Sequence, residues 1–432
     1  MSDTADAYAF DLGGHTRTIS TDSADAQRWF DRGLNWSYAF SREEAHRCFE
    51  KVVELDPDCA IGHWGLAYSY GPYYNGPWDR LPVPQRDKVN KRTYEFIVAA
   101  QGAPNASPAE RALIDAYALR CQAPANDDLE VFARWDDAYA DAMAGVAERF
   151  IEDDDVLALA IDALMCRTPW RLWDLERRTV ADGASTAEAI NLLDLAIGRA
   201  ADEGRQPHPG LLHFKIHLME MSPTPEAALA EADVLRYLIP DAAHLVHMPS
   251  HLYVLCGQFE DSLQSNVEAV VADEKYLAVH PDIGIYHIYM LHNVHFQMYS
   301  AMFLGRYEPA LRAADQIIET VPIDALRHPN QFLVNYLEAF YGMKVHVYIR
   351  FGKWQEIIDE PLPEDQELLC VTTALWHYGK GVAYAATGDV EQAAEQQRLF
   401  AAAFDRVPEE RKVFNNESRD MLRVGEAMLA GE

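Results

Sequence analysis

The feature that most constrains this chain is a pattern of apolar and small residues that recurs along it. Residues 26–57 predict two amphipathic helices, with small residues where the helices cross and a proline after the second. The positions that define this unit are Trp29, Gly33, Trp36, Ala45, Phe49 and Pro57. Parts of the pattern return in residues 303–322 and 379–396. A chain of this kind buries its apolar faces by stacking one helix pair on the next.

The spacings are those of the tetratricopeptide (TPR) repeat, a helix–turn–helix unit with a period of about 34 residues. The intervening segments are also helical in pattern, and none sustains the alternation of a strand. We therefore predict an all-α fold, a TPR-like solenoid of helical hairpins with a concave groove, as one continuous superhelix over residues 1–432. Residues 1–20 and 421–432 are expected to be loosely ordered. Residues 275–289 are expected to form an inserted, lid-like segment.

Three segments resemble a bacterial family of TPR-repeat proteins. They are residues 29–75, the motif HLVHMPSHLY at residues 244–253 and the motif HNVHF at residues 292–296. The resemblance implies a TPR fold and a role for the histidines of these motifs, and it implies no particular reaction.

Histidines recur in one register of the repeat. His213 and His247 are 34 residues apart, as are His217 and His251. At 3.6 residues per turn, the histidines on each helix fall within a stripe about 60° wide. In TPR proteins this stripe, on the first helix of each repeat, lines the groove. We predict that seven histidines converge there as metal ligands: His213, His217, His244, His247, His251, His292 and His295.

Neutral imidazole is the commonest metal ligand, and seven imidazoles exceed one tetrahedral shell. One or two ions per chain are therefore expected, with copper favoured and zinc or iron as alternatives. Glu220 and Asp162 are the candidate catalytic carboxylates. Glu220, three residues after His217, is open to interpretation as a ligand, a partner of a ligand, a general base or an ordinary paired glutamate. Pro249 should kink the helix that carries His244, His247 and His251.

The set of many imidazoles and few carboxylates favours a copper-dependent oxidoreductase that acts on a small molecule. A zinc-dependent hydrolase or lyase in the same pocket is the first alternative. A TPR scaffold that binds a protein partner without catalysis is the second. A merely polar groove and metal storage are further possibilities.

Charge and cysteine content limit the partners and the compartment. The chain has 37 Lys and Arg against 68 Asp and Glu, for a formal charge of −31. Nucleic acid and anionic membrane surfaces both need basic footprints, so neither is an expected partner. No apolar stretch is long enough to span a membrane, and the N-terminus lacks the features of a signal peptide. The 6 cysteines form no recognisable disulfide or zinc pattern, which favours a cytoplasmic location.

Overall fold

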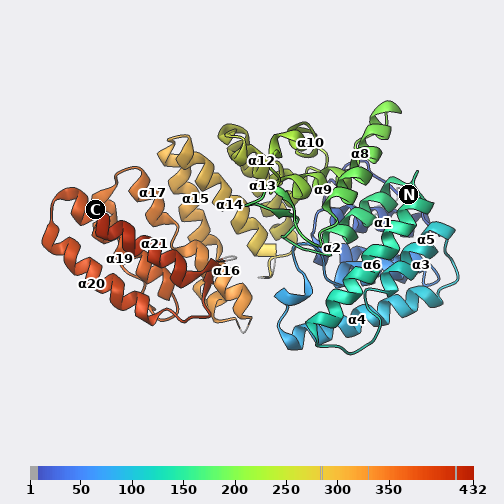
Figure 1. Ribbon diagram of the computed structural model, residues 1–432, viewed down its shortest axis with the longest axis horizontal. Helices are drawn as coiled ribbons and strands as arrows, with labels where there is room; N and C mark the ends of the chain where they lie inside the picture. The colour runs from blue at the N-terminus through green and yellow to red at the C-terminus, as the bar shows by residue number, and fades with distance from the viewer. Residues whose placement is uncertain (1–7, 283, 285, 329, 414–415) are drawn as a thin grey trace, which may run out of the picture. The chain divides into compact units, whose positions relative to one another are not determined.

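A computed structural model describes residues 8–282, 284, 286–328, 330–413 and 416–432 of the chain. The chain divides into two compact units, Met1–Gly257 and Gln258–Glu432, each built almost wholly from α-helices (Figure 1). The predicted all-α class is confirmed. A single continuous superhelix over residues 1–432 stays a prediction. Within the described residues, no helix combines the length and apolarity needed to cross a membrane.

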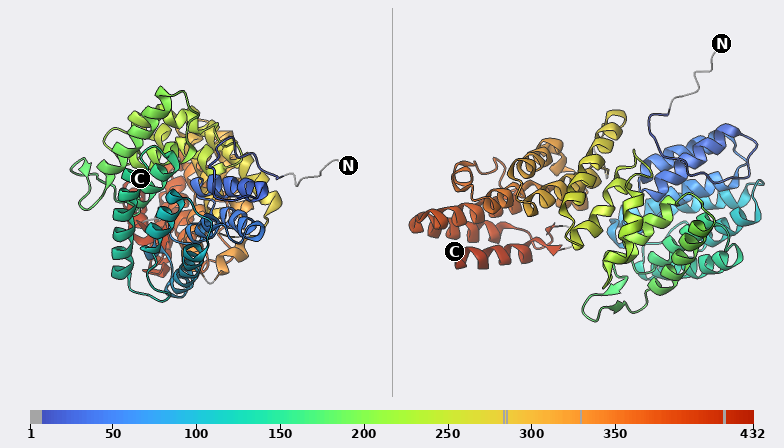
Figure 2. Two further views of the ribbon diagram at one scale, coloured as in Figure 1. Left: turned by 90° about the vertical axis from the view of Figure 1, so that its right-hand side faces the viewer. Right: turned by 90° about the horizontal axis from the view of Figure 1, so that it is seen from above.

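The first unit begins with helical hairpins that follow one another in sequence. Its helices are α1 (Ala24–Tyr38), α2 (Arg42–Leu55), α3 (Ala60–Tyr70), α4 (Val83–Gly102), α5 (Pro108–Ala118), α6 (Leu129–Arg149), α7 (Asp154–Met165), α8 (Thr186–Asp202), α9 (Pro209–Met219), α10 (Leu229–Leu235), α11 (Ala243–His247) and α12 (Pro249–Leu255). Short 3₁₀ helices η1 (Trp78–Arg80) and η2 (Pro225–Ala228) join them. The strands β1 (Trp173–Asp174) and β2 (Thr179–Val180) pair antiparallel in a small hairpin that stands out from the helices (Figure 2).

The second unit continues the same architecture. Its helices are α13 (Phe259–Val279), α14 (Tyr286–Phe303), α15 (Tyr307–Thr320), α16 (Gln331–Tyr341), α17 (Lys344–Arg350), α18 (Trp354–Asp359), α19 (Cys370–Thr387), α20 (Val390–Arg406) and α21 (Ser418–Gly431). A 3₁₀ helix, η3 (Ile323–Arg327), and the paired strands β3 (Lys412–Val413) and β4 (Asn416–Glu417) complete it. Gly305 and Gly388, which the sequence marks as turn positions, have φ of 69° and 86°. Glycine takes this left-handed conformation without steric penalty.

The contact between successive helices depends on small residues at the crossing points. The ring of Phe49 on α2 lies between Gly33 of α1 and Gly65 of α3, and Phe49 is fully buried. A Cβ atom at Gly33 would lie 2.8 Å from the Phe49 ring. The TPR positions Gly33 and Phe49 are therefore in contact, as their spacing in the repeat predicts.

Described residues of both terminal segments pack against the helices, and the expectation that 1–20 and 421–432 are loosely ordered stays a prediction. Residues 1–7 of the segment 1–20 lie outside the described residues. In the rest of that segment, Phe10, Leu12 and Ile19 are buried, and Arg17 pairs with Asp153 at 2.6 Å. Residues 421–432 belong largely to α21, which packs against α19 and α20. The apolar side chains spaced through these acidic segments are what hold them to the helices.

The segment 275–289 is mostly helical. Helix α13 continues to Val279 and α14 begins at Tyr286. The residues predicted to form an insertion therefore chiefly lengthen these two helices. The rings of Tyr276 and Tyr286 stack with centroids 3.9 Å apart. Residues 283 and 285 lie outside the described residues, and movement of 275–289 as a lid stays a prediction.

The Gly33–Phe49 contact predicts the effect of a single methyl group. Replacing Gly33 by alanine should destabilise the protein by about 1–3 kcal/mol, because the added Cβ overlaps the Phe49 ring. Gly145→Ala on α6 is the control, since a Cβ there meets nothing within 4 Å. That change should instead stabilise the protein by up to about 1 kcal/mol. Urea unfolding measures both, and equal effects would contradict the proposed packing.

Candidate metal centre

Helix α9 places two histidines one turn apart in the interior of the first unit. It begins with Pro209 and passes close to α1. The closeness is shown at Gly210, where an added Cβ atom would lie 2.6 Å from the ring of Tyr38. His213 and His217 both lie on its buried surface, with exposed fractions of 0% and 1%. The small residue at position 210 thus brings the histidine-bearing helix against the end of α1.

Helices α11 and α12 carry the other histidines of the first unit. Their boundary falls at Met248, next to Pro249, whose nitrogen has no hydrogen to donate. The backbone of Met248 stays in the helical region, with φ of −50° and ψ of −37°, so the kink expected at Pro249 stays a prediction. His244 and His247 lie on α11 and His251 lies on α12.

Hydrogen bonds fix the tautomers of the two α9 histidines. The Nδ1 of His213 lies 2.6 Å from the carbonyl oxygen of Tyr38, and the Nδ1 of His217 lies 2.7 Å from Oε1 of Glu220. A carbonyl or carboxylate oxygen only accepts, so both Nδ1 atoms carry the hydrogen. In the neutral rings, both Nε2 atoms therefore have a free lone pair. Neither Nε2 has a hydrogen-bond partner among the described residues.

His244 joins this pair to form a group of three buried imidazoles. One ring nitrogen from each of His213, His217 and His244 lies within 4.8 Å of the others. Burial lowers the pKa of His213 and of His244 well below the usual histidine value, and the neighbouring imidazoles add to the effect. His213 and His244 are therefore neutral at neutral pH, and neutral imidazole is the form that binds metal ions. We call His213, His217 and His244 the three-histidine centre.

Glu220 orients histidines on two different helices, His217 on α9 and His251 on α12. Its Oε1 accepts from His217, and its Oε2 accepts from Nδ1 of His251 at 2.6 Å. Burial opposes ionisation of Glu220, but attraction to His251 and His217 and the hydrogen bonds from both hold its pKa below the ordinary glutamate value. With both oxygens engaged, the carboxylate resembles the outer-shell group that orients a metal-binding histidine.

His247 and His251 form a second pair in the same unit. Their Nε2 atoms are 2.9 Å apart. A hydrogen bond has this length, and so do two nitrogens bound at right angles to one ion at about 2.0–2.1 Å each. The contact is compatible with either arrangement.

The remaining predicted site residues are carried by helices α7 and α14. Asp162 on α7 is fully buried and accepts a hydrogen bond from the Tyr68 hydroxyl at 2.9 Å. His292 and His295 lie on α14 in the second unit. There, burial and the nearby His346 lower the pKa of His295 to about 4. Convergence of all seven histidines in one pocket stays a prediction.

The ring of Phe40 covers the three-histidine centre. Its centroid lies 4.6 Å from that of His213, 5.5 Å from that of His217 and 5.6 Å from that of His244. The repeat pattern could not reveal this residue as a site residue, because it lies in the turn between α1 and α2.

The backbone of Phe40 is in an uncommon conformation. It has φ of 56°, in the left-handed region that favours glycine. It follows the end of α1, where the N–H of Ser41 donates to the carbonyl of Trp36 at 3.0 Å. This bond is typical of a helix end at which the left-handed residue is usually glycine. A bulky residue there costs about 1–2 kcal/mol of backbone strain. Such strain is typical of functional sites.

In a second histidine group of this unit, Nε2 rather than Nδ1 donates the hydrogen bond to a protein oxygen. His15 and His208 each place Nε2 at 2.9–3.0 Å from Oδ1 of Asp155, which also accepts from the hydroxyl of Tyr38 at 2.7 Å. The Nδ1 of His208 accepts from the N–H of Leu211, so its Nε2 carries the hydrogen. This group is a satisfied network around a buried carboxylate, and its hydrogens occupy the positions that an ion would need.

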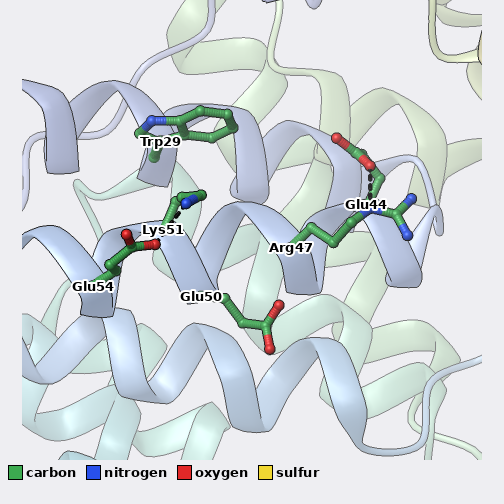
Figure 3. A pocket seen from close by; sticks show the side chains of 6 residues that line it. All are labelled: Trp29, Glu44, Arg47, Glu50, Lys51 and Glu54. Carbon is green, nitrogen blue, oxygen red and sulfur yellow. Dashed lines mark hydrogen bonds and ion pairs between the residues drawn. The ribbon is translucent and has the colours of Figure 1, made fainter. Parts of the chain in front are cut away.

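A surface hollow of about 560 Å³ lies along α1 and α2 (Figure 3). Its lining residues are Trp29, Glu44, Arg47, Glu50, Lys51 and Glu54. Figure 3 shows two ion pairs along α2, Arg47 with Glu44 and Lys51 with Glu54, each at 2.6 Å. None of the seven histidines lines this hollow, so we place the candidate site at the histidines.

Comparisons with known proteins identify neither a family nor a function for this chain. No family model matches the chain, and no curated protein matches it. Among solved structures, it is similar to the TPR domain of P58(IPK), with 16% identity over 94% of this chain and 98% of that one and a TM-score of 0.20. It is also similar to yeast Tom70, with 9% identity over 95% and 90% of the two chains and a TM-score of 0.27. These identities are too low to transfer a function.

The lowered pKa values predict how the metal-free protein responds to acid. In the unfolded chain a histidine binds a proton near pH 6.5, whereas the buried His213 and His244 stay neutral in the folded protein. The free energy of unfolding should therefore decrease as the pH falls below about 6.5. Each such histidine should contribute a slope of up to about 1.4 kcal/mol per pH unit. Urea unfolding of chelated protein between pH 7.5 and 5 measures the slope. His244→Asn should make it shallower, and an unchanged slope would be the contrary result.

Proposed function

We propose that the protein is a metal-dependent enzyme whose ion is bound by the imidazoles of His213, His217 and His244. The observation that carries the proposal is the pair of buried Nε2 atoms on α9. Their Nδ1 hydrogens are fixed on Tyr38 and Glu220, which leaves both lone pairs without a partner among the described residues. Buried acceptors of this kind destabilise a protein unless something occupies them, and a cation satisfies several at once.

The donor set favours copper. Both oxygens of Glu220 are engaged by histidine hydrogens, so the ligands of this centre are imidazoles without a carboxylate. Many zinc hydrolases and the common iron oxygenases include a carboxylate ligand, whereas imidazole sets suit copper and also zinc. We therefore propose a copper-dependent oxidoreductase that acts on a small molecule, with a zinc-dependent hydrolase or lyase as the alternative.

Copper would supply one-electron redox chemistry and an open position for oxygen or substrate. The chain itself would supply the environment. Glu220 and the Tyr38 carbonyl keep the two α9 imidazoles in the ligating tautomer. Phe40 covers the centre and limits the access of water. His247 and His251 are proposed ligands of a second ion.

A protein-interaction scaffold is the competing proposal, because helical-hairpin arrays also bind peptides and proteins in their grooves. This reading needs no ion, so metal content separates the two. A cytoplasmic location is proposed with either function, because the cysteines of this chain are free thiols.

Metal binding should depend on the three-histidine centre in a graded way. Measured by titration calorimetry and elemental analysis, His217→Gln should weaken copper binding more than about a hundredfold, because it removes a ligand. Glu220→Gln should weaken it by about 10–100-fold, because it disturbs the orientation of a ligand. His208→Gln is the matched control, a buried histidine at the start of the same helix whose hydrogens serve Asp155.

Two results would decide against this assignment. Equal loss of metal in His208→Gln and His217→Gln would mean that general damage to α9 explains the effect. A wild-type protein that is fully folded and binds no metal would leave the scaffold proposal.

The reaction class can be tested by reconstitution. Chelated protein loaded separately with Cu, Zn and Fe is assayed for oxygen consumption with a panel of small organic substrates. Copper alone should restore oxygen uptake. Turnover restored by zinc alone, without oxygen uptake, would contradict the oxidoreductase assignment and leave the centre intact.

A further inference from the structure

Two non-repeat segments of the chain, one of them rich in proline and glycine, meet beside the three-histidine centre. Residues 71–85 follow α3, and residues 168–174 follow α7. Tyr74 of the first and Trp170 of the second stack with ring centroids 5.2 Å apart and an interplanar angle of 30°. Their centroids lie 4.9 Å and 6.0 Å from that of His217. The repeat pattern does not account for either segment, yet both contribute aromatic rings here.

Each of these rings carries a hydrogen-bond donor that lacks an acceptor. Tyr74 is fully buried, and its hydroxyl finds no acceptor among the described residues. The indole Nε1 of Trp170 is likewise buried without an acceptor in the described part of the chain. Buried tyrosine and tryptophan donors normally find a partner, so two unsatisfied donors in one stacked pair need an explanation.

A further observation indicates that this arrangement is maintained for a purpose beyond folding. Trp170 has φ of 60°, so it is the second bulky residue at this centre in the left-handed region, after Phe40. A phenol keeps its hydrogen at neutral pH, because its ordinary pKa is about 10. The pair therefore presents two permanent donors next to a proposed metal ligand.

We propose that Tyr74 and Trp170 donate hydrogen bonds to an oxygen atom of a small carboxylate ligand at the three-histidine centre. The inference rests on the proposed function, since the ion would bind the carboxylate as well. Two buried donors on stacked rings beside a cation favour an acceptor that carries negative charge. The rings of Phe40, Tyr74 and Trp170 all have centroids within 6.0 Å of that of His217, so a carboxylate bound beside them would have to be small. The charge of Glu220 is already engaged by His217 and His251, so it does not serve as the acceptor.

The test uses the full chain loaded with Cu(II) and acetate as the probe. Copper content is measured first in every variant by elemental analysis, and acetate binding is then followed by the change in the Cu(II) electron paramagnetic resonance spectrum. Tyr74→Phe and Trp170→Phe keep the rings and remove only the donors. Each should weaken acetate binding on the order of tenfold to a hundredfold, the loss expected for a hydrogen bond to a charged group, with copper content unchanged.

Tyr117→Phe is the matched control. Tyr117 is also fully buried, but its hydroxyl donates to the carbonyl of Ala67 at 3.1 Å. This variant should bind acetate like the wild type and unfold at lower urea concentration. Tyr74→Phe should unfold at the same or higher urea concentration than the wild type in the absence of acetate, because it removes a donor that the fold leaves unsatisfied.

The outcomes separate the two proposals. Copper bound by the wild type with equal acetate affinity in Tyr74→Phe, Trp170→Phe and wild type would overturn this inference alone. A copper spectrum that acetate does not change in the wild type would overturn it as well. A wild-type protein that binds no copper would overturn the proposed function and this inference together.

Discussion

Close contact between helices at glycine positions sets the geometry on which the site depends. Phe49 fits between Gly33 and Gly65, which fixes the spacing of the first hairpins. Gly210 does the same where α9 passes Tyr38. Because α9 lies so near the end of α1, a backbone carbonyl at the end of that helix reaches the imidazole of His213. The packing of α9 against α1 therefore also determines which nitrogen of His213 carries the hydrogen.

Glu220 links the histidines of α9 to those of α12. Its two oxygens accept from histidines on α9 and on α12, so one buried carboxylate determines the tautomers of both. The Asp155 network, which includes His208 at the start of α9, uses histidine hydrogens in the other sense, to satisfy a carboxylate. Histidines paired with an acidic residue thus form a stabilising network around Asp155. Beside Glu220, the Nε2 lone pair of His217 is left available to an ion. The direction of the Nδ1 and Nε2 hydrogens distinguishes them.

The sequence predicts the helical fold and the register of the histidines because both are periodic. The 34-residue spacing of His213 and His247 follows from the repeat, and the structure places His213 next to His244 in one group. It could not predict the partners of these histidines. Tyr38 contributes a backbone carbonyl, and Phe40, Tyr74 and Trp170 come from turns and loops, where no period applies. The role of Glu220 also remained open until its two hydrogen bonds were known.

The left-handed conformation of Phe40 has a consequence for how this protein can change over evolutionary time or in the laboratory. A glycine at position 40 would relax the helix end, so selection for heat resistance alone would favour it. The same substitution would uncover three imidazoles. Stability therefore favours glycine at position 40, whereas the proposed function favours phenylalanine. A screen that scores only survival at high temperature would tend to replace the residue that covers the three-histidine centre.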